Sequence, residues 1–326
     1  GSATPSLETY ARALSGELTL LRMPERIGAQ PLPRVRAVDM RAELRHGRRT
    51  ILSNDLRDLL TETLARGEQA IIMLNRRGYS TFVLCRACGF VLSCHACGQP
   101  MVYHANGTLV CHHCDLRADV PSVCPQCGSR CIKYFGAGTE KLEAELAQLL
   151  PQARVIRMDR DTTGRKHAHE EILAHFRRRD YDILLGTQMV AKGHDLPGVQ
   201  TVGIISADAS LNLPDFRAAE RCFMLITQTA GRAGRHGARG EVIVQTYNPE
   251  HYAVQSALRQ DYEAFYAQEI VLRRELFYPP LSRLVKLLFH HMDRQRAWDA
   301  AAAFVDVFQK AFHGRQGYMV VGPSPA

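Results

Sequence analysis

The sequence predicts an α/β fold in which a parallel sheet carries a cysteine-rich insertion and is followed by the beginning of a further β-α-β domain. Short apolar runs alternate with amphipathic segments through most of the 326 residues, and such alternation with short connections is typical of a parallel sheet. Eight cysteines are confined to one connection of this pattern, between positions 85 and 127. A Tyr-Pro-Pro boundary at 278–280 precedes the last apolar runs.

The segment before the cysteines predicts a helix and a buried strand. A short helical stretch near the N-terminus precedes residues 24–41, where prolines and basic residues indicate a connector. A helix over 54–65 begins at a capping residue, either Ser53 or Asn54. The continuous apolar run Ala70–Leu74 then indicates a strand that is buried on both faces.

The segment after the cysteines resumes the alternation, so we interpret the cysteine-rich region as an insertion into an α/β domain. Beyond the boundary at 278–280, the pattern predicts a β-α-β unit that is incomplete. In order, the expected elements are strand 132–135, helix 139–149, strand 155–158, helix 168–179, strand 183–185, strand 202–206, helix 215–230, strand 242–245, strand 284–289, helix 295–312 and strand 318–321.

The eight cysteines form four Cys-x-x-Cys pairs. A spacing of two residues lets one tight turn aim both sulfurs at the same ion, so four pairs predict two closed tetrahedral zinc sites. Gly89, Gly98 and Gly128 each follow a pair directly, where a positive φ turns backbone N–H groups toward sulfur. The pairs are Cys85/Cys88, Cys94/Cys97, Cys111/Cys114 and Cys124/Cys127.

The spacing alone leaves open which pairs share an ion, and iron is an alternative to zinc, although a less usual one. A disulfide framework suits short secreted chains and is disfavoured here, because the chain is long and shows no signal peptide. His95, His112, His113 and Cys131 lie near the pairs. We expect them not to be ligands, since four pairs already complete two tetrahedra.

The formal net charge of +8 indicates an acidic partner such as nucleic acid. This indication is weak. Ionising eight thiols lowers the net charge by eight and binding two Zn²⁺ ions raises it by four, so the net charge would be only +4. No apolar run approaches the length of a membrane span. Reduced, paired cysteines then favour the cytosol as the compartment.

The densest functional pattern outside the cysteines is Gln-x-x-Gly-Arg-x-Gly-Arg at 228–235. Arg232 and Arg235 are spaced by small residues at the end of an expected helix. Guanidinium groups keep their charge and offer a fork of donors, and glycine lets the backbone approach a ligand, so the pattern favours phosphate binding. The plainer interpretation of such a pair is a basic surface turn.

Several motifs together resemble those of superfamily 2 helicases. The pattern at 228–235 is similar to their motif VI, residues 186–195 to motif V and residues 2–5 to motif III. With the paired cysteines, residues 75–79 and residues 136–140, essentially the whole chain resembles one family, the bacterial replication-restart helicases PriA, also called primosomal protein N′. The resemblance implies a RecA-like second helicase lobe with a binuclear zinc insertion.

The resemblance also implies roles in nucleotide binding. In such helicases ATP lies between two RecA-like lobes. Arg235 would be the arginine finger, with Arg232 close by, and Gln228 would sense the nucleotide. Gly193 and Asp195 would face the cleft and link hydrolysis to lobe movement.

Further roles concern DNA and zinc. Thr187, Gln188 and Lys192 would lie near the DNA backbone, and the basic residues Arg76 and Arg77 would also serve DNA binding. The zinc pairing of the family is nested. This assigns Cys85, Cys88, Cys124 and Cys127 to one ion, and Cys94, Cys97, Cys111 and Cys114 to the other.

The sequence departs from a complete helicase in one respect. It contains no Gly-Lys followed by Ser or Thr to cradle phosphates and no Asp-Glu pair to hold Mg²⁺. We therefore expect a fragment that does not hydrolyse ATP alone, although its longer parent would use ATP and Mg²⁺. An alternative hypothesis is a non-enzymatic, zinc-containing scaffold that binds nucleic acid.

The expected domains are the end of the first lobe with a connector (1–50), the second RecA-like lobe (51–84 and 132–278), the zinc insertion (85–131) and a truncated C-terminal domain (279–326). The resemblance implies a cytoplasmic, nucleoid-associated helicase that translocates 3′-to-5′, recognises stalled replication forks and directs primosome assembly. Its implied partners are forks and single-stranded DNA, PriB, DnaT, the replicative helicase with its loader, and single-stranded DNA-binding protein. No membrane is implied.

Overall fold

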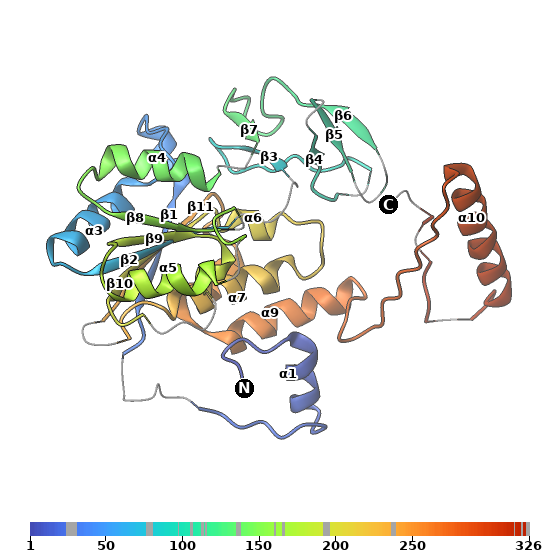
Figure 1. Ribbon diagram of the computed structural model, residues 1–326. Helices are drawn as coiled ribbons and strands as arrows, with labels where there is room; N and C mark the ends of the chain where they lie inside the picture. The colour runs from blue at the N-terminus through green and yellow to red at the C-terminus, as the bar shows by residue number, and fades with distance from the viewer. Residues whose placement is uncertain are drawn as a thin grey trace.

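The computed structural model shows two β-sheets and the helices that cover the larger one (Figure 1). The smaller sheet lies above the main sheet in this view, and the last helix lies apart from both. The structure describes residues 1–23, 31–75, 81–96, 98–104, 107–111, 114, 116–134, 138–159, 161–164, 167–191, 196–235, 239–315, 317–320 and 322–323.

The main sheet has six parallel strands, which confirms the predicted fold class. Every residue of the central strand β2 is buried, as expected for a strand covered on both faces. Across the sheet the order is β1 (Arg34–Asp39), β11 (Glu241–Thr246), β10 (Val199–Ile205), β2 (Gln69–Leu74), β9 (Ile183–Gly186) and β8 (Val155–Met158).

Alternate side chains of β2 enter two separate apolar clusters. Ile71 and Met73 belong to one cluster, whereas Ala70, Ile72 and Leu74 belong to the other, because successive side chains of a strand point to opposite faces. Helices α5 (Ala168–Arg177), α7 (Ala218–Ala230), α8 (Tyr252–Arg259) and α9 (Tyr262–Glu275) cover the first face. Helices α2 (Met40–Arg45), α3 (Asn54–Ala65) and α4 (Thr139–Leu149) cover the second.

The smaller sheet has five antiparallel strands and a cluster of its own that includes Cys94 and Cys111. Strand β3 joins the two sheets, because Phe82 and Leu84 pack in the cluster on the second face of the main sheet. The order is β6 (Arg117–Asp119), β5 (Thr108–Val110), β4 (Val102–Tyr103), β3 (Thr81–Cys85) and β7 (Ile132–Tyr134).

Two expectations about strands near the cysteines and the N-terminus were wrong. Strand 132–135 was expected to continue the α/β pattern, but β7 pairs antiparallel with β3 in the smaller sheet. This sheet therefore begins before, and ends after, the predicted insertion at 85–131. Residues 34–39, interpreted as part of a connector, form β1 and pair with β11 along their whole length. Arg34 and Arg36 interrupt the apolar pattern there, which an edge strand tolerates.

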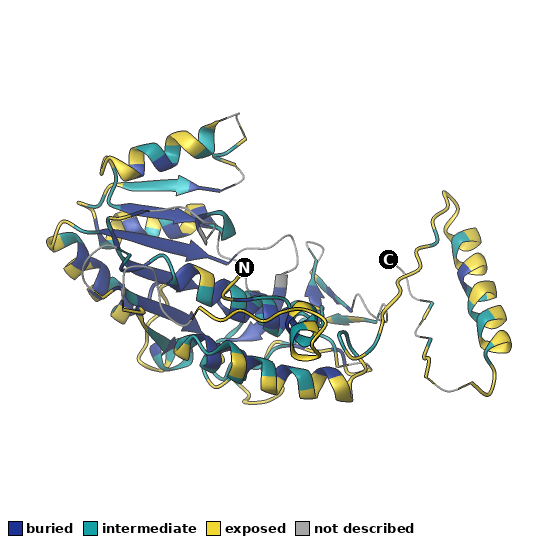
Figure 2. Ribbon diagram, turned by 90° about the horizontal axis from the view of Figure 1, so that it is seen from below, coloured by how far each residue is buried: buried dark blue, intermediate teal, exposed yellow. Residues whose placement is uncertain are grey.

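The segment after 278 also differs from expectation. Helix α10 (Arg294–Ala311) is present, but residues 284–289 and 318–320 form no strand. A strand needs a partner, and neither run is paired within the described part of the chain. Only Ala301 of α10 is buried, and Figure 2 shows the helix exposed over most of its surface. No described helix is long and apolar enough to cross a membrane.

A buried group of charges ties α7, α9 and the N-terminal helix α1 (Leu7–Leu14) together. The Arg273 guanidinium, 1% exposed, donates to Glu269 at 2.6 Å and to Glu220 at 3.1 Å. Glu220 also accepts from the Leu7 N–H at 3.2 Å. Burial raises the pKa of Glu220, and Arg273 opposes this shift. Helices α7 and α9 thus hold the start of the chain through a buried ion pair.

Replacing Arg273 with methionine is expected to lower the free energy of unfolding by about 3–5 kcal/mol, because two buried carboxylates lose their partner. Chemical denaturation followed by circular dichroism measures the change. Arg274→Met is the control, since Arg274 is the exposed neighbour on the same helix, and it should change the value by less than about 0.5 kcal/mol. Equal effects of the two substitutions would contradict this account.

Candidate functional site

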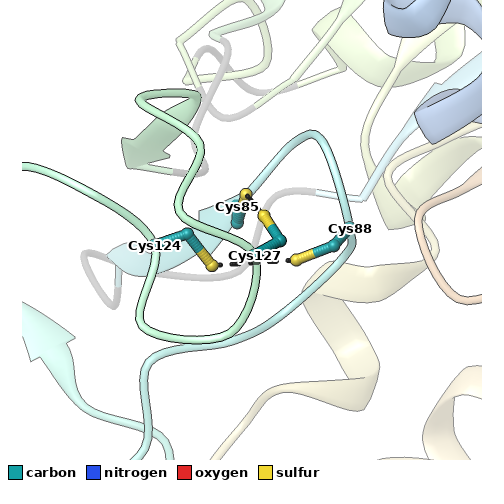
Figure 3. Close-up of side chains that lie close together, drawn as sticks. All are labelled: Cys85, Cys88, Cys124 and Cys127. Carbon is teal, nitrogen blue, oxygen red and sulfur yellow. Dashed lines mark hydrogen bonds between the residues drawn. The ribbon is translucent and has the colours of Figure 1, made fainter.

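The first candidate metal centre consists of four cysteines from two segments of the smaller sheet. The sulfurs of Cys85, Cys88, Cys124 and Cys127 lie within 4.8 Å of one another (Figure 3). Cys85 and Cys127 are 3.7 Å apart at Sγ, as are Cys88 and Cys124. A tetrahedron with Zn–S bonds of about 2.3 Å has edges of about 3.8 Å. The sulfurs therefore have the spacing that one zinc ion requires.

Tight turns aim these sulfurs at a common point. The Gly89 N–H donates to the Cys85 carbonyl at 2.8 Å, and the Gly128 N–H donates to the Cys124 carbonyl at 2.9 Å. Both glycines have positive φ, 83° and 68°, where glycine avoids the strain that a Cβ would cause. The expectation of positive φ after the pairs is confirmed here, and also at Gly98.

Burial and the neighbouring thiols make the four cysteines of this centre differ in how readily they lose a proton. Burial raises the pKa of Cys85, and burial together with the neighbouring cysteines raises the pKa of Cys88 to about 12. Burial acts in the same direction on Cys124, but the N–H groups of Cys127 and Gln126 outweigh it and lower that pKa. A zinc ion would deprotonate all four thiols and offset their charge.

The second candidate centre lies inside the smaller sheet. The sulfurs of Cys94, Cys111 and Cys114 form a second group, with Cys94 and Cys114 3.5 Å apart. Cys97 lies outside the described residues. The structure thus brings the described cysteines together in the nested arrangement that the resemblance implies. Among the residues that the structure describes, Cys131 and His95 belong to neither group.

The first candidate metal centre contacts Tyr247, the residue that directly follows β11 in the main sheet. Arg86, inside the first pair, donates from Nε to the Tyr247 hydroxyl at 2.8 Å. A Cβ at Gly89 would lie 2.6 Å from the Tyr247 carbonyl oxygen, so only glycine permits this approach. The Tyr247 N–H in turn donates to Asp208, whose pKa burial raises to about 6. The sequence offered no signal for this contact, because Arg86 and Tyr247 are 161 positions apart.

The residues expected to bind nucleotide lie at the end of α7 and in the turn that follows. Gln228 donates from Nε2 to the Thr4 hydroxyl at 3.1 Å, which joins the segments that resemble motifs VI and III. Arg232 and Arg235 each donate from Nε to a carbonyl four residues earlier, at 3.4 and 3.1 Å. Gly234 has a φ of 62° and donates to the Val199 carbonyl at the amino end of β10.

Two residues expected near DNA lie at the opposite edge of the sheet. Thr187 follows β9, and Gln188 begins the short 3-10 helix η2 (Gln188–Ala191). Gln188 donates from Nε2 to the side chain of Asn75 at 3.3 Å. Asn75 begins the segment 75–79 that contributes to the family resemblance, but the sequence assigned it no role of its own, although a polar residue directly after a buried strand is a signal. The expected site residues Arg76, Arg77, Lys192, Gly193 and Asp195 lie outside the described residues.

Substituting Cys124 with serine is expected to reduce the bound zinc from about two equivalents to about one, because a closed four-thiolate site loses a ligand. Atomic emission spectrometry of the purified protein measures the ratio. Cys131→Ser is the matched control and should retain both ions, since Cys131 belongs to neither group. Loss of zinc from the Cys131 variant, or full zinc content in the Cys124 variant, would refute the assignment.

The sequence of this chain is similar to those of known proteins. Residues 126–237 match the family model of the helicase conserved C-terminal domain. The replication restart protein PriA of Bacillus subtilis (strain 168) is 50% identical over 325 residues, which cover 99% of this chain and 40% of that protein. The protein of the same name from Haemophilus influenzae is 37% identical over 331 residues, 100% of this chain and 44% of that protein.

PriA of Synechocystis sp. is 46% identical over 296 residues, 88% of this chain and 36% of that protein. The chain thus spans about two fifths of the length of these relatives. The similarity extends through the main sheet, both cysteine groups and the segment that carries α10, so this chain belongs to the PriA family of replication restart proteins.

Proposed function

We propose that this chain is the second helicase lobe of an ATP-dependent DNA helicase that translocates 3′-to-5′ and restarts replication at stalled or abandoned forks. The observation that carries the proposal is the placement of Gln228, Arg232 and Arg235 at the end of α7, with Gln228 bonded to Thr4. Both partners of that bond belong to segments that resemble helicase motifs, although 224 positions separate them.

Arg235 is the proposed arginine finger. Its Nε–H is bonded to the Gly231 carbonyl, which sets the plane of the guanidinium group. A guanidinium presented to the γ-phosphate stabilises the charge that spreads over the transferring phosphoryl group, an effect worth about 10³–10⁵ in rate. Arg232 and Gln228, with Gly193 and Asp195, would contact the same nucleotide.

The proposed DNA contacts lie at the other edge of the sheet. Thr187 and Gln188 follow the carboxyl end of β9, the edge at which open parallel sheets bind their ligands. Lys192, Arg76 and Arg77 belong to the same two connections and would add positive charge for the phosphates. Nucleotide and DNA would therefore meet different edges of one rigid sheet.

The two zinc ions have a structural role in this proposal. A centre with four thiolates has no open coordination position, so zinc supplies folding energy rather than catalysis. The cysteine-rich unit would act as a wedge or a partner platform beside the motor. The proposed domain division is 1–50, 51–84 with 132–278, 85–131 and 279–326.

The remaining elements of the proposal concern the whole protein. ATP and Mg²⁺ would bind together with a first lobe that supplies the P-loop and the Asp-Glu pair, so this chain alone would not hydrolyse ATP. Forks, single-stranded DNA, PriB, DnaT, the replicative helicase with its loader, and single-stranded DNA-binding protein are the proposed partners. The proposed location is the bacterial cytoplasm, at the nucleoid.

In the full-length protein, Arg235→Ala is expected to lower DNA-stimulated ATP turnover by about 10³-fold or more, with DNA binding retained, because the transition state loses its guanidinium. A coupled assay of phosphate release measures turnover. Arg239→Ala is the control and should have little effect, since Arg239 donates to the Leu32 carbonyl, in the segment that precedes β1. An unmodified protein that shows no turnover would instead favour a non-enzymatic scaffold.

A further inference from the structure

Asn75 occupies a buried position where three strands of the main sheet end. It follows β2 directly, and the residue is 3% exposed. Its backbone N–H donates to the Ile205 carbonyl at 3.1 Å, which holds it beside the end of β10. Its side chain lies between Ser206 and Ser210 on one side and Gln188 on the other.

The hydrogen bonds fix the orientation of the Asn75 amide. Its Nδ2 donates to the Ser210 hydroxyl at 2.8 Å and to the Ser206 carbonyl at 3.4 Å. A carbonyl only accepts, so the NH₂ group has to face this side. The Oδ1 atom therefore faces Gln188 and accepts from its Nε2 at 3.3 Å.

This orientation in turn constrains Gln188. A carboxamide can rotate by half a turn at little cost in solvent, which exchanges its donor and acceptor ends. Because Asn75 presents the acceptor Oδ1, it favours the Gln188 rotamer in which Nε2, and not Oε1, faces Asn75. An NH₂ group fixed in this orientation is a suitable donor to a phosphate oxygen.

The short helix α6 (Asp208–Leu211) holds the Asn75 side chain on the side away from Gln188. Ser210, 2% exposed, belongs to this helix. Asp208 anchors the same helix by accepting from the Tyr247 N–H and from the Thr246 hydroxyl at the end of β11. The Asn75 amide is thus held by a helix that is itself fixed to the sheet.

We propose that Asn75 is a positioning residue for DNA binding, which fixes the carboxamide of Gln188 so that it donates to the phosphodiester backbone of single-stranded DNA. The inference rests on the proposed role of Gln188 at the DNA backbone. Asn75 does not itself contact the strand. Its contribution appears only where Gln188 is present.

The test is a double-mutant cycle in the full-length, zinc-loaded protein. Fluorescence anisotropy with a labelled single-stranded oligothymidylate gives the Kd without ATP. Gln188→Ala should weaken binding by about ten- to a hundredfold, the range for one lost hydrogen bond to a charged group, and Asn75→Ala should weaken it by no more than that. The double variant should bind no more weakly than Gln188→Ala alone, because Asn75 acts through Gln188.

Controls separate this role from general destabilisation. Asn212→Ala should leave the Kd unchanged, because Asn212 lies at the end of the same helix and bonds only the Asp208 carbonyl in the described contacts. Ser210→Ala should shift the Kd in the same direction as Asn75→Ala, and by a smaller factor. A lower melting temperature of the Asn75 variant with an unchanged Kd would show a purely structural role and overturn the inference.

The remaining outcomes are also decisive. Independent effects that multiply in the double variant would overturn the positioning role, as would a Gln188 variant with unchanged Kd. ATP turnover at saturating DNA is measured in the same samples. If ATP turnover is normal but the double-mutant cycle shows no coupling between Asn75 and Gln188, this inference is overturned and the proposed helicase function stands. If turnover is absent but the coupling is found, the proposed helicase function is overturned and the positioning role of Asn75 stands.

Discussion

The central strand β2 is the constraint on which the rest of this structure depends. Its six residues are buried, and alternate side chains enter separate apolar clusters. At roughly 25 cal/mol per Å² of apolar surface, this double burial strongly fixes the register of β2 between β9 and β10. Asn75 leaves the sheet at the end of β2, and the chain enters the cysteine-rich unit shortly afterwards. The position of that unit therefore follows from the position of one strand.

The smaller sheet has short strands and a small apolar cluster, so its stability has a different source from that of the main sheet. Its strands have two to five residues, and its cluster contains few large apolar side chains besides cysteines. Two zinc ions bound by four thiolates each would supply the stability that such a short segment lacks, on the order of 10 kcal/mol per site. The zinc ions would then add to the stability that the smaller sheet gains where Phe82 and Leu84 pack in the main core.

The sequence predicted the parts of the structure that depend on local patterns. Apolar runs located the strands of the main sheet except β1, where Arg34 and Arg36 interrupt the apolar pattern. The cysteine spacing located both cysteine groups that could hold a metal ion, although spacing could not say which pairs share an ion. The runs at 284–289 and 318–321 have strand composition, but a strand also requires a hydrogen-bonding partner, which composition does not reveal.

Contacts between distant residues were the part that could not be predicted. Gln188 and Asn75 are 113 positions apart, and Arg86 and Tyr247 are 161 apart. Each contact depends on the sheet order, because β2, β9, β10 and β11 bring their carboxyl ends to one edge. Local periodicity specifies each strand but not its neighbours, so the helicase motifs were visible in the sequence while the contacts that support them were not.

The short helix α6 links these long-range contacts into one arrangement. Ser210 accepts from the Asn75 side chain, which in turn accepts from Gln188, and Asp208 accepts from the Tyr247 N–H near the first cysteine group. The Tyr247 hydroxyl then accepts from Arg86, which lies between Cys85 and Cys88. A helix of four residues has little stability of its own, so its position is set by these partners. The metal centre and the proposed DNA edge are consequently parts of one continuous hydrogen-bonded support, and a displacement of either would have to break a buried bond at α6.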